Sequence, residues 1–293
     1  MEPTWEISEG LLQNDDKFRD PFFKRFALRH AAKPIQLNES VSKNYFFPTF
    51  YGDVTCAIAV FLCPYENAKK MMPHPEMKPV RMPKGRAAVL VSGYEYKNVM
   101  GVGPYNEIAM TIPVLVKPLI DLPVLPMLMD SYPGFGVHVF SMPVTSLENQ
   151  LRGLKIWNLP KVVQRIDIDH HDGVCIVAAY EESGEQYFEM KVPTEGTQTH
   201  FDTGAWLYTE MDGRLARSRT SFKADFQVNK HMKALLNPGM QPQQEVFKLG
   251  DTPSGRVLQD LELEPQPLQF RYAKGMTACF DLADPGYKSP LKF

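Results

Sequence analysis

The chain consists largely of short runs of β-branched and aromatic residues, each bounded by glycine, proline or an Asp-Gly pair. Asp172-Gly173 and Asp212-Gly213 each lie between two such runs, and an Asp-Gly pair in this position is a strong short-range signal for a β-hairpin. The chain also contains 25 prolines, and proline interrupts both helices and central strands. We therefore expect many short strands and few, short helices.

The expected strands follow one another along most of the chain. They cover residues 46–63 (as a pair around Gly52-Asp53), 86–96, 107–116, 136–142, 162–169, 174–180, 186–192, 205–211, 215–222 and 268–272. Short helices are expected at 64–72, 146–153 and 229–236. Short strands joined by tight turns predict a mainly β (α+β) fold, either an antiparallel β-barrel or a curled sandwich with a few helices.

The first 45 residues differ from the rest because they are polar and carry little strand pattern. A helix is expected within 15–29, with four phenylalanines on one side. We interpret 1–45 as an N-terminal helical arm that packs on the body or on a neighbouring subunit. Residues 46–293 then form one β-barrel domain, whose C-terminal tail from Gln241 wraps the surface.

Composition excludes several classes of protein. The formal net charge of −2 gives no electrostatic reason to expect nucleic acid or an anionic membrane as a partner. The longest apolar stretch, residues 112–129, is broken by Lys117, Asp121 and four prolines, so it is not a membrane span. The four cysteines form no Cys-x-x-Cys pair, and the acidic N-terminus lacks the apolar core of a secretory signal. We expect a cytoplasmic protein with reduced thiols.

Lys161 is the first candidate for chemistry. It follows Trp-Asn-Leu-Pro (157–160) and precedes Val162-Val163, so apolar side chains flank its ammonium group. A desolvated lysine has a lowered pKa, and its neutral amine can attack a ketone to form a Schiff base. The alternative is a lysine whose stem lies on apolar surface while its head stays in water.

Glu107 is the second candidate. If Ile108, Met110 and Ile112 face one side of their strand, then Glu107 shares the other side with Ala109 and Thr111. A carboxylate beside small residues inside a barrel would be partly desolvated, as suits a proton-transfer group. The alternative is a strand-edge glutamate paired with an arginine or a lysine.

The order of three segments resembles the acetoacetate decarboxylase superfamily. They are Glu-Asn-Ala-Lys-Lys-Met-Met-Pro-His-Pro (66–75), Gly-Val-Gly-Pro-Tyr-Asn-Glu (101–107) and Gly-Leu-Lys-Ile-Trp-Asn-Leu-Pro-Lys (153–161). The resemblance covers roughly residues 45 to 225. It implies a conical, closed β-barrel with Lys161 inside as the Schiff-base nucleophile and Glu107 as an active-site carboxylate. It also implies chemistry without a metal or an organic cofactor. Activation of the lysine by desolvation or by a second cation is known for this enzyme class.

The chain departs from the pattern of that family at three places. The residue after Lys161 is Val162 instead of a second lysine, so desolvation alone is expected to lower the pKa of Lys161. The family's other active-site glutamate falls at Ser92, and Glu95 would face the opposite side of the strand. The family's arginine for the substrate carboxylate has no match around residues 52–54, which leaves Arg152 and Arg165 as candidate replacements.

Together these features predict a Schiff-base-forming lyase that decarboxylates a β-keto acid, or a related oxo acid, larger than acetoacetate. The first alternative is an aldolase-dehydratase acting on a 2-oxo acid, such as pyruvate, plus an aldehyde. The second is a non-catalytic barrel that binds a hydrophobic ligand. Tyr105 is expected to orient the substrate and Trp157 to wall the pocket. The Phe-rich arm and the long tail predict a homo-oligomer.

Overall fold

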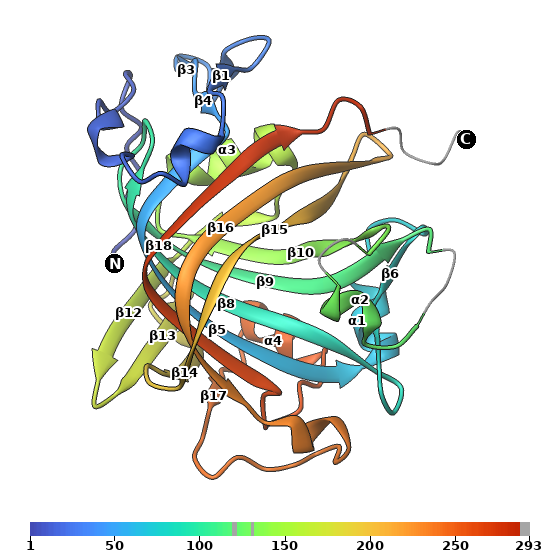
Figure 1. Ribbon diagram of the computed structural model, residues 1–293. Coiled ribbons are helices and arrows are strands. Elements are labelled where there is room, and N and C mark those ends of the chain that lie inside the picture. The colour runs from blue at the N-terminus through green and yellow to red at the C-terminus, as the bar shows by residue number, and fades with distance from the viewer. Residues whose placement is uncertain (119–121, 130–131, 288–293) are drawn as a thin grey trace.

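The computed structural model describes residues 1–118, 122–129 and 132–287. Its centre is a ring of long strands (Figure 1). In spatial order these are β10 (Phe135–Val144), β15 (Thr197–Met211), β16 (Arg214–Lys230), β18 (Gln269–Ala283), β5 (Thr49–Pro64), β8 (Arg86–Val99) and β9 (Tyr105–Val116). Strand β9 pairs back to β10 and closes the ring. The predicted closed, mainly antiparallel barrel is therefore confirmed, with a parallel seam between β10 and β15.

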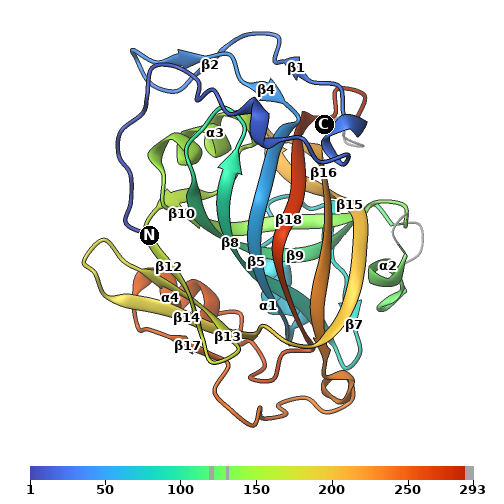
Figure 2. The same cartoon turned by 60° about the vertical axis from the view of Figure 1, so that its left-hand side comes forward.

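A smaller antiparallel sheet covers part of the outside of the barrel (Figures 1 and 2). It contains β12 (Arg165–His171), β13 (Val174–Tyr180), β14 (Gln186–Pro193) and β17 (Phe247–Leu249). Short strands complete the β-structure: β1 (Arg29–His30) with β4 (Phe46–Phe47), β2 (Ile35–Gln36) with β3 (Ser42–Lys43), and β6 (Met77–Pro79), β7 (Arg81–Met82) and β11 (Lys161–Val163) along the barrel.

Alternating side chains of β5, β8 and β9 form two separate cores. Ala57, Val91 and Ile108 point outward and pack with residues of the small sheet such as Val177. Their neighbours on the same strands, such as Ala109, point into the barrel. This is the division that the alternation around Glu107 predicts, since successive side chains of a strand face opposite sides.

The helices are short, as expected. They are α1 (Tyr65–Lys70), α2 (Leu125–Leu128), α3 (Leu147–Trp157) and α4 (Pro253–Gln259), with 3-10 turns η1 (Asp15–Lys17), η2 (Phe23–Arg25) and η3 (Met232–Leu235). Within the described ranges, no helix is both long and apolar enough to cross a membrane. Helix α3 lies at the end of the barrel near the N-terminal segment (Figure 1).

Both predicted Asp-Gly hairpins are confirmed. Asp172 and Gly173 join β12 to β13 with φ values of 47° and 76°, and Asp212 and Gly213 join β15 to β16 with 51° and 74°. Two positive φ values in succession match the right-handed twist of the flanking strands, and Asp-Gly adopts them at low cost.

Two expectations about the first 63 residues were wrong. The arm is not helical, because residues 15–29 contain only the turns η1 and η2. Its aromatic side chains do gather on one side, and Phe22 and Phe23 pack against Phe50 of β5. Packing against the barrel, and not helix formation, therefore determines the conformation of this segment. Residues 46–63 do not form a strand pair around Gly52; β5 runs through it as one strand, with Asp53 at φ 50°.

The C-terminal region was only partly predicted. A strand near 268–272 was expected within a tail on the surface, whereas β18 extends from Gln269 to Ala283 and lies between β16 and β5. Figures 1 and 2 show this strand as an integral part of the barrel wall. Lys274 and Gly275 interrupt its alternation, and the pairing with β5 shifts between Ala273 and Met276. Such a bulge hides a long strand from a search for strict alternation.

Candidate active site

The local chain path around α3 delivers Lys161 to the barrel interior. Ser146 caps the start of the helix by accepting a hydrogen bond from the Asn149 amide, and Asn158 ends it in the left-handed region at φ 52°. Strand β11 then pairs in parallel with β10, with Lys161 opposite Met142. The Lys161 side chain passes against Gly153, where a Cβ atom would lie 2.4 Å from Lys161 Cδ. Helix and lysine therefore fit together only because residue 153 has no side chain.

Lys161 and Glu107 form a buried ion pair. Lys161 Nζ donates a hydrogen bond of 2.6 Å to Glu107 Oε2. The side chains are 7% and 5% exposed, respectively. Glu107 belongs to β9 and lies opposite Val144 of β10, so the lysine reaches across β10 to meet it. The two leading sequence candidates, 54 residues apart in the chain, therefore meet in space.

The pKa of Lys161 is lowered from the ordinary value of a lysine. Burial is the largest cause, the negative charge of Glu107 and its hydrogen bond oppose it, and the positive charge of Arg152 lowers the pKa further. The expectation that no neighbouring cation assists was therefore wrong. The second cation comes from α3, and the residue after the lysine does not supply it.

Arg152 is 2% exposed and has neutral partners. It donates hydrogen bonds of 3.0 Å to Asn149 Oδ1 and Thr49 Oγ1, and its guanidinium lies 4.4 Å from the centre of the Tyr45 ring. Its Nε has no hydrogen-bond partner among the residues that the structure describes. A buried guanidinium that keeps a free N–H close to a nucleophilic amine can accept a substrate carboxylate.

The outward orientation of Val162 indicates that a second lysine at this position would have little effect on the pKa of Lys161. Adjacent strand residues face opposite sides, and Val162 is 45% exposed while Lys161 points inward. Val162 lines an outer pocket of about 260 Å³ together with Pro160 and Val257. A lysine at position 162 would therefore place its charge outside the barrel.

Two tyrosines enclose the ion pair. The Tyr96 hydroxyl donates a hydrogen bond of 3.2 Å to Glu107 Oε1, and the centre of the Tyr105 ring lies 5.6 Å from Lys161 Nζ. Burial, followed by the charge of Glu107, raises the pKa of both tyrosines well above the usual value. Both phenols therefore remain protonated, and Tyr96 can donate to Glu107 at any ordinary pH.

The other candidates from the sequence lie farther from the pair. Ser92 is buried on β8, opposite Ala109, two residues from the position that faces Glu107. Glu95 faces outward, as expected, and accepts a hydrogen bond from Thr55. Arg165 is exposed on β12 and pairs with Asp167, so it does not replace the missing arginine.

Trp157 serves the packing of α3. Its indole N–H donates to the Asp281 carbonyl at 2.8 Å, and its ring stacks on Phe280 with centres 4.5 Å apart. These contacts fix the end of α3 onto β18. The indole is buried within the inner core, and its role as a wall of the pocket stays a prediction.

Sequence reasoning missed Tyr96 and Gly153. Tyr94 and Tyr96 alternate on β8, opposite Glu107 and Tyr105 respectively. The period-two spacing of the tyrosines was a signal for one shared face, but only the strand register places that face against Glu107. The signal at Gly153 was its fixed place before Pro-Lys, whereas its close approach to the lysine is visible only in three dimensions.

The interior of the barrel is not fully packed around this site. Leu90, Tyr94, Tyr96 and Phe201 pack on the inner core, yet each is partly exposed. Partly exposed residues on the inner face of a closed ring indicate that solvent enters the barrel.

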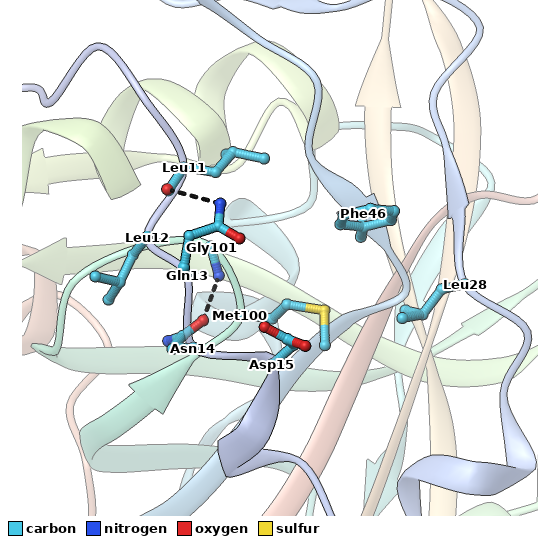
Figure 3. A pocket seen from close by; sticks show the side chains of 9 residues that line it. All are labelled: Leu11, Leu12, Gln13, Asn14, Asp15, Leu28, Phe46, Met100 and Gly101. Carbon is cyan, nitrogen blue, oxygen red and sulfur yellow. Dashed lines mark hydrogen bonds between the residues drawn. The ribbon is translucent and has the colours of Figure 1, made fainter.

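The pocket in Figure 3 is a separate feature. It has a volume of about 370 Å³ and lies between the N-terminal segment and the turn at Met100-Gly101. Asn14 Oδ1 accepts a hydrogen bond of 3.0 Å from the Gly101 amide at its edge. Neither Lys161 nor Glu107 lines it. Among the described side chains, no group of three or more His, Cys, Asp or Glu residues is arranged to hold a metal ion.

Comparison with known proteins was made for sequence and for structure. The sequence profile of the acetoacetate decarboxylase (ADC) family matches residues 32–209, which is more than half of the chain. No curated protein sequence matches. The crystal structure of acetoacetate decarboxylase from Legionella pneumophila is similar, with a TM-score of 0.55 and 12% identity over 92% of this chain and 93% of that one.

Two further solved structures share the fold. An acetoacetate decarboxylase structure has a TM-score of 0.54 and 11% identity, covering 84% of this chain and 91% of that one. The enduracididine biosynthesis enzyme MppR, complexed with the condensation product of pyruvate and imidazole 4-carboxaldehyde, has a TM-score of 0.52 and 11% identity, covering 80% and 89%. With the profile match across barrel and lysine, these findings establish that the chain belongs to the acetoacetate decarboxylase family.

Proposed function

We propose that this protein is a cofactor-independent carbon-carbon lyase that acts on an oxo acid through an imine formed on Lys161. The observation that carries the proposal is the 2.6 Å contact between a buried lysine and a buried carboxylate inside the barrel. Removing two charges from water is costly, and a buried ion pair adds little stability over apolar residues of the same size. A chemical role accounts for keeping the pair.

The reaction follows from the groups at the site. The neutral amine of Lys161 attacks the substrate carbonyl, and loss of water leaves a protonated imine. The imine accepts the electron pair of the breaking C–C bond, so carbon dioxide leaves from a β-keto acid and an enamine forms. Glu107 transfers a proton taken up from solvent to the enamine carbon, and hydrolysis of the new protonated imine by water releases the ketone and restores Lys161.

The surroundings of Lys161 fit this sequence of steps. Its lowered pKa increases the fraction of neutral amine, which is the nucleophile. Glu107 lies within hydrogen-bond distance of Lys161 Nζ, and Tyr96 donates to its other oxygen. These two hydrogen bonds hold the Glu107 carboxylate in a fixed orientation, in which one oxygen can exchange a proton with the amine of Lys161.

Arg152 supports a second candidate, an aldolase-dehydratase that joins a 2-oxo acid to an aldehyde. Decarboxylation removes the negative charge of the carboxylate, so a cation that holds this carboxylate stabilises the ground state more than the transition state. Arg152 is close enough to Lys161 to lower its pKa, and within the described part of the chain its Nε has no hydrogen-bond partner. It would retain the carboxylate of a 2-oxo acid such as pyruvate, the compound named in one MppR complex.

Reductive trapping tests both candidates. The protein is incubated with a β-keto acid, or with pyruvate, in the presence of borohydride, and the adduct is weighed and mapped by mass spectrometry. An adduct on Lys161 that lacks the carboxyl group supports decarboxylation. An adduct that keeps the carboxyl group, and that also contains the aldehyde carbons when the aldehyde is added before the borohydride, supports the aldolase.

The control is Lys155→Ala, which removes an exposed lysine of α3. This variant should be trapped like the wild type, whereas Lys161→Ala should not react. Absence of any adduct on Lys161 with every carbonyl compound would overturn the proposal and favour a non-catalytic barrel.

A further inference from the structure

Arg271 is an arginine on the inner face of the barrel. It lies on β18 opposite Ile58 of β5 and Val228 of β16, and both of these belong to the inner core. Its neighbours Phe270 and Tyr272 point outward into the other core. Figure 2 shows β18 between β5 and β16. The alternation of the strand therefore directs the Arg271 side chain into the barrel.

The guanidinium of Arg271 has no carboxylate partner among the residues that the structure describes. Its Nε donates 2.7 Å to Gln269 Oε1, and its centre lies 5.0 Å from the centre of the Phe201 ring. Burial lowers the pKa of Arg271, and the neighbouring ionisable groups are the thiol of Cys56 and the phenol of Tyr94. Neither group carries a negative charge near neutral pH, because the pKa values of both are raised by burial.

Two buried cations of this protein are paired with carboxylates, whereas Arg152, like Arg271, has neutral partners. Lys43 pairs with Glu148 at 2.9 Å, and Arg86 pairs with Glu264 at 2.9 Å. An enclosed cation without an anion is costly, since its charge is poorly solvated. The remaining guanidinium N–H groups of Arg271 are thus available to an anion that enters the barrel.

The strand register places Arg271 three strands away from Glu107 around the barrel wall. Glu107 on β9 faces Tyr94 on β8, Tyr94 faces Cys56 on β5, and Cys56 faces Ala273 on β18. Three strand spacings correspond to about 14 Å along the wall. Arg271 is two residues along β18 from that row. A β-keto acid carries its carboxylate only two bonds from the carbonyl carbon, whereas a longer oxo acid can extend from Lys161 toward the part of the wall that carries Arg271.

We propose that Arg271 binds a second anionic group, a carboxylate at the end of the substrate remote from the carbonyl that reacts with Lys161. This inference rests on the proposed imine chemistry and specifies its substrate class as an elongated oxo acid with a distal carboxylate. Two partly exposed inner-core residues neighbour Arg271: Tyr94 acts on its pKa, and the ring of Phe201 lies 5.0 Å from its guanidinium. Arg271 lies outside the segment 32–209 that matches the family profile.

The test compares ligands that differ in one charge. Levulinate and its homologues with longer methylene chains carry a ketone and a terminal carboxylate, and the corresponding primary amides are neutral analogues. Trapping on Lys161 is measured against concentration for wild type, Arg271→Gln and the control Arg256→Gln. Arg256 is an exposed arginine of α4 that pairs with Asp251. Thermal midpoints confirm that the variants are folded.

We expect the wild type to prefer the acid over the amide by about 10- to 100-fold at one optimal chain length, as befits charge-assisted hydrogen bonds. Arg271→Gln should lose this preference while it still traps the amide, and Arg256→Gln should keep it. If wild type and Arg271→Gln are trapped with the same preference for the acid over the amide, the role of Arg271 is overturned and the imine chemistry is left intact.

Heptanoate and heptanamide separate the two proposals further, because neither can form an imine. Calorimetric binding of heptanoate that weakens at least tenfold in Arg271→Gln supports the anion site even if no ketone is trapped. Equal binding of heptanoate and heptanamide to the wild type counts against it. Absence of trapping with every ketone would instead overturn the imine chemistry.

Discussion

The contact between Gly153 and Lys161 predicts that one methyl group on α3 will disable the site. In Gly153→Ala the new Cβ would lie 2.4 Å from Lys161 Cδ, 2.7 Å from Cε and 2.9 Å from Cγ. These distances are too short for carbon atoms, and all three belong to the stem that carries the amine. The cheapest relaxation moves the lysine side chain, which separates Nζ from Glu107 and leaves the backbone of α3 and β11 in place.

Two opposing terms set the size of the effect. Breaking a buried ion pair costs about 3–5 kcal/mol, because both charges remain buried without partners. Alanine in place of glycine in a helix contributes about 1 kcal/mol in the opposite direction. We therefore expect Gly153→Ala to lower the free energy of unfolding by about 2–4 kcal/mol. Displacement of the amine by about 1 Å should slow imine formation by about 100-fold.

A double-mutant cycle tests this account, with urea unfolding for stability and borohydride trapping for reactivity. In a Lys161→Ala background the clash has no partner, so Gly153→Ala should stabilise the helix by about 1 kcal/mol. Leu154→Ala, at an exposed neighbouring position of α3, serves as the control that leaves trapping unchanged. Two results would contradict a steric effect on the lysine stem. One is trapping of oxo acids on the Gly153→Ala protein at the wild-type rate. The other is that the Gly153→Ala substitution destabilises the Lys161→Ala protein as much as it destabilises the wild type.

Three further predictions concern the ion pair and its cation. Glu107→Gln should still allow trapping on Lys161. Its turnover, measured as steady-state product formation, should fall by about 10²- to 10⁴-fold because the group that transfers the proton is lost. Unchanged turnover would exclude that role for Glu107. Arg152→Met removes a positive charge that lowers the pKa of Lys161, so the pKa should rise and the midpoint of the pH–trapping profile should move to higher pH. A midpoint that moves to lower pH would contradict the assignment of Arg152 as the second cation. Val162→Lys should leave the same midpoint unchanged, since its side chain faces outward, and a downward shift would show that a cation there does reach Lys161.

Much of the fold could be predicted because its signals are local. Asp172-Gly173 and Asp212-Gly213 each determine a hairpin within a few residues, and the alternation of Ile108 and Ala109 separates the two faces of one strand. The length of the strand that contains Arg271 was underestimated because a bulge breaks its alternation. Its place in the barrel was not predicted because no local signal shows which strands flank it. The helix expected in 15–29 failed for the opposite reason: contacts of its phenylalanines with β5 outweigh local propensity.

The candidate site divides in the same way. Lys161 and Glu107 could be chosen from their apolar settings and from the order of motifs, since both properties are written along the chain. The contributions of Arg152, Tyr96 and Gly153 could not, because charge effects and steric contacts depend on distances of a few ångströms in space. Strand pairing and the path of α3 determine those distances.

The sequence by itself determined the strand-rich class, the two hairpins, the pair of candidate groups Lys161 and Glu107 and the resemblance to a family, because each depends on neighbouring residues or on their order. The tertiary structure alone decided that Val162 points outward and that Arg152 supplies the second cation. It also decided that the last barrel strand carries Arg271 to the inner face. The physical reason is ring closure: alternation tells which residues share a face of one strand, but only the pairing of distant strands brings those faces together around one interior.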